Sequence, residues 1–297
     1  MTLPAAALFG LMVWLLEGLV QRELWLQFGL FVLSVYLLVE LSNQNALLRV
    51  RSRMVSSTFI MLSCAACFLL PDMKGALLQL CIVVAFLMSF QAYQNPQAVG
   101  DVYFAFVSIG VGSMAFVQLL WYVPLLWLLL STQLQAMSWR TWLASLLGLV
   151  TPYWFALVWL LYQQDFSLAV THFSALGQFG FSLQQLTLSR ILVFAFLVIL
   201  SAAGVIHFWS YSFEEKIRIR LIYGFLTSLL SFTLLFIVLQ PQHYDALLRI
   251  AIVCASPLIA HVFTFTASRI SNILFFVTAG LAVVIAAFSL WMQSLIF

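Results

Sequence analysis

Charge is what this sequence most lacks. Only 7% of its 297 residues are Asp, Glu, Lys or Arg, and 65% are hydrophobic, whereas soluble domains are about a quarter charged. So few charged side chains cannot cover a surface that faces water, so lipid must be the main solvent of the exterior. This excludes an ordinary water-soluble domain and predicts an integral membrane protein.

The sequence also lacks the short motifs of common active sites. It contains no Gly-rich phosphate loop, zincin helix or nucleophile elbow. Its C-x-x-C, Cys64 and Cys67, lies in the apolar "MLSCAACFLL" with no second pair and no nearby His, which favours packing over metal or redox use. The net charge is only +3, and the basic residues are scattered through loops. We therefore expect no cofactor, no metal and no nucleic-acid partner.

Long apolar runs are abundant instead. A helix of about 20 residues crosses a hydrocarbon core, and eleven runs can be drawn, at residues 4–20, 25–41, 54–71, 76–94, 102–119, 121–135, 142–162, 191–212, 221–239, 247–267 and 273–295. They predict an all-α bundle of about eleven transmembrane helices (range 9–11), with residues 1–297 as a single transmembrane domain. The fifth and sixth runs could be one helix bent at Pro124, and Pro152 predicts a kink or break. "MTLPAAALFG" has no basic n-region, so we expect the first span to be retained.

Two basic loops give the orientation. One contains Arg49, Arg51 and Arg53, and the other contains Lys216, Arg218 and Arg220. Six runs separate them, so both loops fall on one side, which the positive-inside rule makes cytoplasmic. We expect the N-terminus inside, the C-terminus outside and a multi-pass protein of a bacterial inner membrane. At the end of the second run, Glu40 is expected to pair with an arginine of the first loop.

Glu17 is the first candidate for chemistry. It shares a helical face with Trp14 and Gln21 and lies beside Arg22 and Glu23. A carboxylate facing lipid is costly, so this face should turn to the bundle interior or to a wet cavity near the outer surface. There Glu17 or Glu23 could act as a catalytic base. Glu17 could equally be a structural acid that pairs with Arg22.

Two histidines lie inside apolar runs. His261 forms a polar stripe with Pro257, Thr264 and Ser268, and His207 lies in the eighth run. With Gln21, these residues are candidates for the polar lining of a cavity or path. The same side chains could instead form hydrogen bonds between helices. The long connection from 163 to 190 has apolar residues at helical spacing and reads as an amphipathic segment on the membrane surface.

Several segments resemble a known family. The stretches "NALLRVRSR", "LLPD", "DVYFAFVSIGVGSMAF", "QLLWYVPLLWLLL" and "WLASLLGLVTPYW" are similar to a family of uncharacterised polytopic bacterial inner-membrane proteins, a domain of unknown function, over most of residues 40–160. A looser likeness is to C-type membrane glycosyltransferases, which use polyprenyl-phosphate-linked sugars. That likeness implies a catalytic acid in the first outer loop, the place of Glu17 or Glu23. The loop is much shorter here.

Three functions follow as hypotheses. The first is a subunit or assembly component of an envelope system, with its polar groups paired and no large cavity. The second is an enzyme acting on a lipid-linked substrate, with Glu17 or Glu23 as base and Arg22 or Arg190 contacting a phosphate or headgroup. The third is a carrier or flippase with a polar path past His207 and His261. The expected partners are membrane lipids, with a lipid-linked substrate or other membrane subunits.

Overall fold

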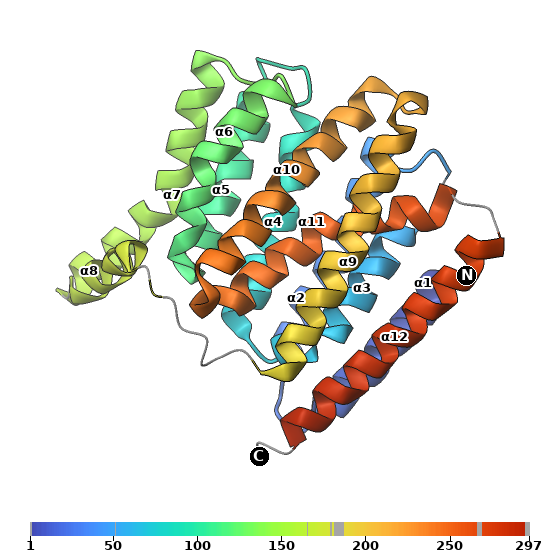
Figure 1. Ribbon diagram of the computed structural model, residues 1–297. Helices are drawn as coiled ribbons and strands as arrows, with labels where there is room; N and C mark the ends of the chain where they lie inside the picture. The colour runs from blue at the N-terminus through green and yellow to red at the C-terminus, as the bar shows by residue number, and fades with distance from the viewer. Residues whose placement is uncertain are drawn as a thin grey trace.

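The fold is a bundle of α-helices (Figure 1). The computed structural model describes residues 2–50, 52–164, 166–178, 180, 187–265 and 269–294. Over these residues there are twelve α-helices and no strand: α1 Thr2–Leu16, α2 Trp25–Asn45, α3 Met54–Ala65, α4 Met73–Gln91, α5 Val99–Ala115, α6 Tyr122–Thr132, α7 Trp139–Gln163, α8 Ser167–Ser174, α9 Leu188–Tyr211, α10 Ile217–Leu239, α11 Tyr244–Phe265 and α12 Arg269–Ser294. The predicted all-α class is confirmed.

Seven helices are long and apolar enough to cross a membrane. They are α2, α4, α7, α9 (with the turn after it), α10, α11 (with the turn before it) and α12. Four shorter apolar helical segments, Thr2–Leu16, Met54–Ala65, Val99–Ala115 and Val117–Thr132, fall in the remaining predicted runs. The protein is therefore a membrane-protein bundle by length and composition, while the count of eleven spans and the orientation stay predictions.

Helix α11 forms the centre of the bundle. It packs against α3, α4, α9 and α10, and every residue from Leu247 to His261 is buried. Most of these side chains are apolar, and a mostly apolar helix needs such a position. Pro257 lies inside α11, and the helix continues through it. Pro152 is likewise inside an uninterrupted α7, so the structure does not show the predicted break.

The fifth and sixth runs are two helices. The first ends at Ala115, Phe116 takes an extended backbone conformation, and a short 3₁₀ helix, Val117–Trp121, leads into α6. After α6 the chain comes back to the end of the bundle at which α5 begins. There the N–H of Gln94, before α5, donates to the carbonyl of Leu134, after α6. Pro124 is not the breaker. It lies in the first turn of α6, where a missing N–H is tolerated.

Helices α5 and α7 cross closely because glycines line the contact. A Cβ on Gly110 would lie 2.8 Å from the carbonyl oxygen of Leu149, and a Cβ on Gly148 would overlap the carbonyl oxygen of Tyr103. Beyond this crossing, α7 leads to the short helix α8 at the edge of the bundle (Figure 1). The predicted helical segment after residue 163 is thus present as α8, while residues 165, 179 and 181–186 of that connection lie outside the described part.

The two basic loops meet at one end of the bundle, which we call the basic end. Arg49 contacts Glu214 and Glu215, which follow α9. Arg218, in the first turn of α10, donates to the Asn45 side chain and to the carbonyl of Phe90. Two loops at the same end of the bundle are separated by an even number of crossings, so their positions are consistent with the six spans predicted between them. Arg51 lies outside the described residues.

Candidate functional site

A polar cavity of about 430 Å³ lies at the basic end. Four elements surround it: α9, the turn after α9, α11 and the loop before α3. Its lining side chains are mostly charged or polar and are Arg49, His207, Tyr211, Glu214, Glu215, His261 and Phe265. We call these seven residues the relay cavity, because an ordered series of polar contacts runs along its wall.

The series begins with a buried carboxylate. The side chain of Glu215 is 3% exposed, and its Oε1 lies 2.8 Å from the Nε of Arg49. The other side of the Arg49 guanidinium reaches Glu214, at 3.4 Å from Nη1 to Oε2. One arginine therefore serves two carboxylates, so the cavity wall has one negative charge in excess when both glutamates are ionised.

The histidines continue the series. The Nε2 of His261 lies 3.5 Å from Glu215 Oε1, and its Nδ1 lies 3.4 Å from the Nδ1 of His207. His261 is 1% exposed and meets the stacked rings of Phe208 and Tyr223 edge-on, with centroids 5.2 and 5.4 Å from its own. His207 is half-buried and also lines the cavity. The structure thus brings together the two histidines that the sequence placed in separate runs.

Two polar atoms of this series have no hydrogen-bond partner within the described chain. They are Oε2 of Glu215 and Nε2 of His261, and both are buried. A buried polar group without a partner costs free energy, about 1 to 3 kcal/mol, unless a water or a bound molecule satisfies it. The cavity has room for several waters or for one small organic molecule. These two atoms therefore mark where a ligand would be held.

A metal is not a good match for the cavity. Among the described residues, no group of three or more His, Cys, Asp or Glu side chains is placed to hold a metal ion. The nearest approach is His261 with Glu215, and there the guanidinium of Arg49 already occupies the carboxylate. A cation coordinated at this point would face that positive charge directly.

Only part of the predicted stripe on α11 reaches the cavity. Thr264 donates to the carbonyl of Ala260 in its own helix, at 2.7 Å, and does not line the cavity. Pro257 acts through its carbonyl, which accepts from the hydroxyl of Tyr223 at 3.2 Å. Ser268 lies outside the described residues. Of the residues predicted to line a polar cavity, His207 and His261 line this one.

Glu17 lies near the opposite end, in the turn between α1 and α2. Its side chain is 2% exposed, and Arg22 Nη1 lies 3.4 Å from its Oε1. When the Gln293 amide is oriented by its neighbours, its nitrogen donates to both carboxylate oxygens, at 2.7 and 3.2 Å, and its oxygen accepts from the N–H of Phe68 at 3.2 Å. Burial raises the pKa of Glu17 to about 7, although Arg22 acts to lower it. This acid is enclosed and hydrogen-bonded.

The predicted face around Glu17 is only partly formed. Helix α1 ends at Leu16 and the chain turns at Gly18, whose φ of +96° suits glycine. Gln21 and Glu23 are exposed in this turn. Gln21 therefore does not share a buried helical face with Glu17, and the assumption that the helix continued to residue 20 was wrong.

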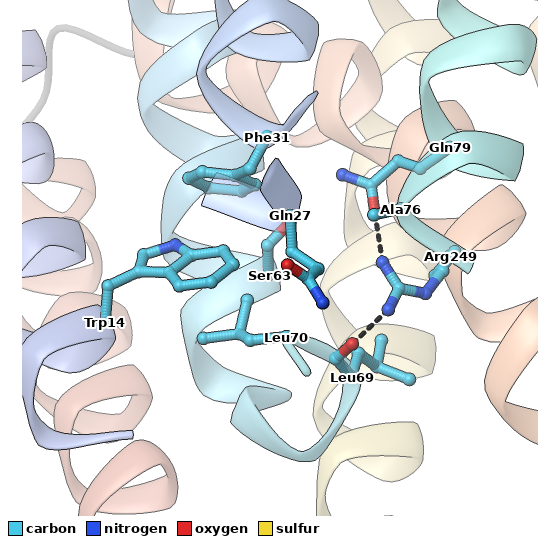
Figure 2. Close-up of a pocket in the computed structure, with 9 residues that line it drawn as sticks. All are labelled: Trp14, Gln27, Phe31, Ser63, Leu69, Leu70, Ala76, Gln79 and Arg249. Atoms are coloured by element: carbon cyan, nitrogen blue, oxygen red, sulfur yellow. Dashed lines mark hydrogen bonds between the residues drawn. The ribbon is translucent and has the colours of Figure 1, made fainter. Parts of the chain in front are cut away.

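A second buried polar centre surrounds Arg249 of α11 (Figure 2). Its guanidinium donates to Gln79 Oε1 at 3.1 Å and to the carbonyls of Leu69 and Asp72. The side chain is 4% exposed. Gly75 makes this possible, because a Cβ at that position would overlap the guanidinium. The adjoining cavity is about 10 Å³, close to the least volume that holds one water, so this centre is structural.

Arg190 also forms an ion pair within the protein. Its Nε and Nη2 donate to the two carboxylate oxygens of Asp245, at 3.1 and 2.7 Å, in a bidentate pair. Its carbonyl accepts from the hydroxyl of Tyr244 at 2.7 Å. The proposed role of Arg190 and Arg22 as phosphate or headgroup contacts would therefore compete with the ion pairs that each makes.

The comparisons with known proteins return nothing. No protein-family model, no curated protein and no solved structure matches this chain. The resemblance to a family of uncharacterised membrane proteins stays a prediction.

Sequence reasoning identifies only two of the seven residues of the relay cavity, His207 and His261. It interprets Arg49 and Glu215 only as parts of loops that set orientation, and it expects Glu40 to pair with an arginine of the first loop. In the structure, the Glu40 carboxylate accepts from Gln44 at 2.7 Å, and Arg49 turns to Glu215. One signal was available: two acids precede Lys216 in a loop that otherwise needs only positive charge.

Proposed function

We propose that the protein is a multi-pass carrier of a bacterial inner membrane, and that the relay cavity binds a small polar solute. The observation that carries this proposal is a 430 Å³ cavity with Glu215 and His261 buried in its wall. Small-molecule sites are commonly cavities of about 300 to 1,000 Å³. Ionisable side chains within a membrane bundle are costly and usually mark a substrate or ion path.

The helices around the cavity support movement. Pro257 removes one backbone hydrogen bond from α11, one turn before His261, and so allows this helix to bend there. On α9, Gly204 lets the backbones approach closely, since a Cβ there would lie 3.0 Å from the carbonyl of Leu258. A bend in α11 would carry His261 relative to His207 and change which side of the membrane the cavity faces.

The two other hypotheses have less support. A structural component predicts paired polar groups, which the Arg190–Asp245 pair fits, but it also predicts no large cavity. An enzyme with Glu17 as base needs that acid at the mouth of a cavity, whereas its side chain is only 2% exposed. The relay cavity therefore favours the carrier.

Thiol labelling from each side of the membrane tests the carrier proposal. The four native cysteines are all buried, so a cysteine introduced as Tyr211→Cys, at a residue that lines the cavity outside the relay, is the main target. A membrane-impermeant maleimide is applied to sealed vesicles of the two orientations. A carrier predicts labelling from both sides, because the cavity opens alternately to each. Labelling from the basic end alone would contradict the proposal. The matched control is Ile206→Cys, which is 68% exposed on the outer surface of the bundle and is expected to stay unlabelled in lipid.

A further inference from the structure

We infer that the relay cavity binds a proton as well as the solute, and that Glu215, His261 and His207 form the relay that carries it. This inference rests on the proposed carrier function and names its coupling ion. It is carried by three successive approaches between polar atoms, of 2.8, 3.5 and 3.4 Å, that lead from Arg49 through Glu215 and His261 to His207.

The buried carboxylate fixes the tautomers of both histidines. An ionised Glu215 can only accept, so the hydrogen of His261 is favoured on Nε2, which faces it. At 3.5 Å the contact lies just beyond hydrogen-bond reach, and a bridging water or a small shift closes it. With Nε2 protonated, Nδ1 of His261 is an acceptor. His207 must then donate from its own Nδ1, which leaves its Nε2 as a free acceptor.

This arrangement defines a complete path for one proton. A proton from the cavity binds to His207 Nε2, and the Nδ1 proton of His207 moves to His261 Nδ1. The Nε2 proton of His261 then moves to Glu215, directly or through the bridging water. At the end, both histidines are neutral with their tautomers exchanged, and Glu215 is an uncharged acid. One proton has entered, and the negative charge of the carboxylate has been neutralised.

Protonation of Glu215 changes its interaction with the charged groups around it. Arg49 faces Glu215 from the loop before α3 and also reaches Glu214. Tyr211 lies over His207, with ring centroids 4.8 Å apart, and Tyr223 of α10 lies beside His261. When Glu215 becomes neutral, Arg49 loses its strongest attraction there and keeps Glu214. The contact between the α3 loop and the α9–α10 turn is thereby weakened.

That loss of attraction is a physical basis for coupling. The Arg49–Glu215 pair holds two loops together at the basic end, so a proton on Glu215 favours the state in which they separate. A solute that needs Arg49 or Glu215 would compete with this pair in the same way. Proton and solute binding therefore act on one equilibrium between conformations, which is the requirement for coupled transport.

Nitrogen-15 NMR of labelled histidine tests the relay. The chain has only four histidines, and their imidazole signals can be assigned with single His→Gln variants. In the wild type at neutral pH, we expect the proton of His261 on Nε2 and that of His207 on Nδ1. On acidification, the two signals should change with one shared midpoint. In Glu215→Gln, that midpoint should move to lower pH by about one unit or more, because the anion that stabilises the added proton is gone. Glu40→Gln, a carboxylate at the same end but outside the cavity, should not move it.

A His261 proton on Nδ1 in the wild type would overturn the relay. A midpoint that is unchanged in a folded Glu215→Gln protein would overturn it as well. The two proposals fail separately. Labelling of Tyr211→Cys from one side only, with the wild-type histidines behaving as predicted, would remove the carrier and keep the proton site. Labelling from both sides, with a histidine midpoint that does not change in Glu215→Gln, would keep the carrier and remove the proton relay.

Discussion

The Nε of Arg49 lies 2.8 Å from Oε1 of Glu215, and this contact joins two loops that are far apart in the sequence. It places both basic loops at the same end of the bundle. It also places a charged group beside Glu215, whose Oε1 lies 3.5 Å from Nε2 of His261. Topology and the candidate site therefore depend on the same pair.

The first prediction concerns topology. Reporter tags inserted after Arg53 and after Arg220 should report the same compartment, because the two loops touch in the folded protein. Under the positive-inside rule that compartment is the cytoplasm. Paired alkaline phosphatase and green fluorescent protein fusions measure this. If the two sites reported opposite compartments, the arrangement of helices around the relay cavity would be wrong.

The second prediction concerns the stability of the buried acid. Arg49→Ala leaves the Glu215 carboxylate buried without its charged partner, so it should lower the free energy of unfolding by about 2 kcal/mol. Glu215→Gln in the Arg49→Ala background should restore much of this loss, because the uncompensated charge is removed. Thermal unfolding in detergent gives the comparison. Arg53→Ala, at an exposed arginine four residues away, is the matched control and should change the melting temperature little. Equal effects of Arg49→Ala and Arg53→Ala would count against the pair.

The third prediction concerns pH and Glu17. Burial raises its pKa to about 7 from an ordinary value of 4.5, so the folded protein binds more protons than the unfolded chain between these values. The contribution of Glu17 to the free energy of unfolding is therefore greatest below about pH 4.5. It falls as the pH rises from about 4.5 to 7 and stays low above about pH 7. Glu17→Gln should flatten this part of the profile and raise the melting temperature at pH 8 relative to the wild type.

Glu23→Gln is the control for that measurement. Glu23 lies in the same turn but is exposed, so its replacement should leave the slope between pH 5 and 8 as it is in the wild type. Melting temperatures measured at several pH values decide the matter. A wild-type slope that persists in Glu17→Gln would show that another group titrates in this window.

The fourth prediction concerns Gly75. Its missing Cβ makes room for the Arg249 guanidinium and for the Asp72 carboxylate that caps α4. Gly75→Ala should displace Arg249 and cost about 1 to 3 kcal/mol of stability, the usual range for overpacking. Gly280→Ala in α12 has no atom within 4 Å of the new Cβ and should be neutral or stabilising by about 0.5 kcal/mol. If Gly75→Ala were as stable as Gly280→Ala, the packing argument for the Arg249 centre would fail.

Much of the fold follows from apolar runs and from charge. Each of the eleven runs contains a helix in the structure, since in lipid a helix is the way to satisfy every backbone group. The predicted helix boundaries were wrong where a turn depends on the backbone angles of a single residue. Gly18 ends the first helix region early, and Phe116, not Pro124, separates the fifth and sixth runs. Such angles are set by tertiary packing, and the periodicity of the sequence carries no information about them.

The candidate site was predictable only in part. His207 and His261 stand out because a histidine inside an apolar run is rare and costly. Their meeting is not visible in the sequence, because it depends on which helices are neighbours. Arg49 and Glu215 were hidden for a different reason. Arginines in a short loop between apolar runs are already explained by the positive-inside rule. Nothing in the sequence therefore separates the arginine that reaches into the bundle from those that face water.

Proton movement in sealed proteoliposomes tests the central claim most directly. Vesicles containing a pH-sensitive dye are given a pH gradient, and a defined mixture of amino acids, amines, carboxylates and sugars is added outside. With the wild-type protein, the mixture should speed the loss of the gradient at least several-fold. Glu215→Gln vesicles should respond no more than empty ones, and Glu40→Gln vesicles should respond like the wild type. A gradient that decays equally with and without the mixture in wild-type vesicles would contradict a proton-coupled carrier.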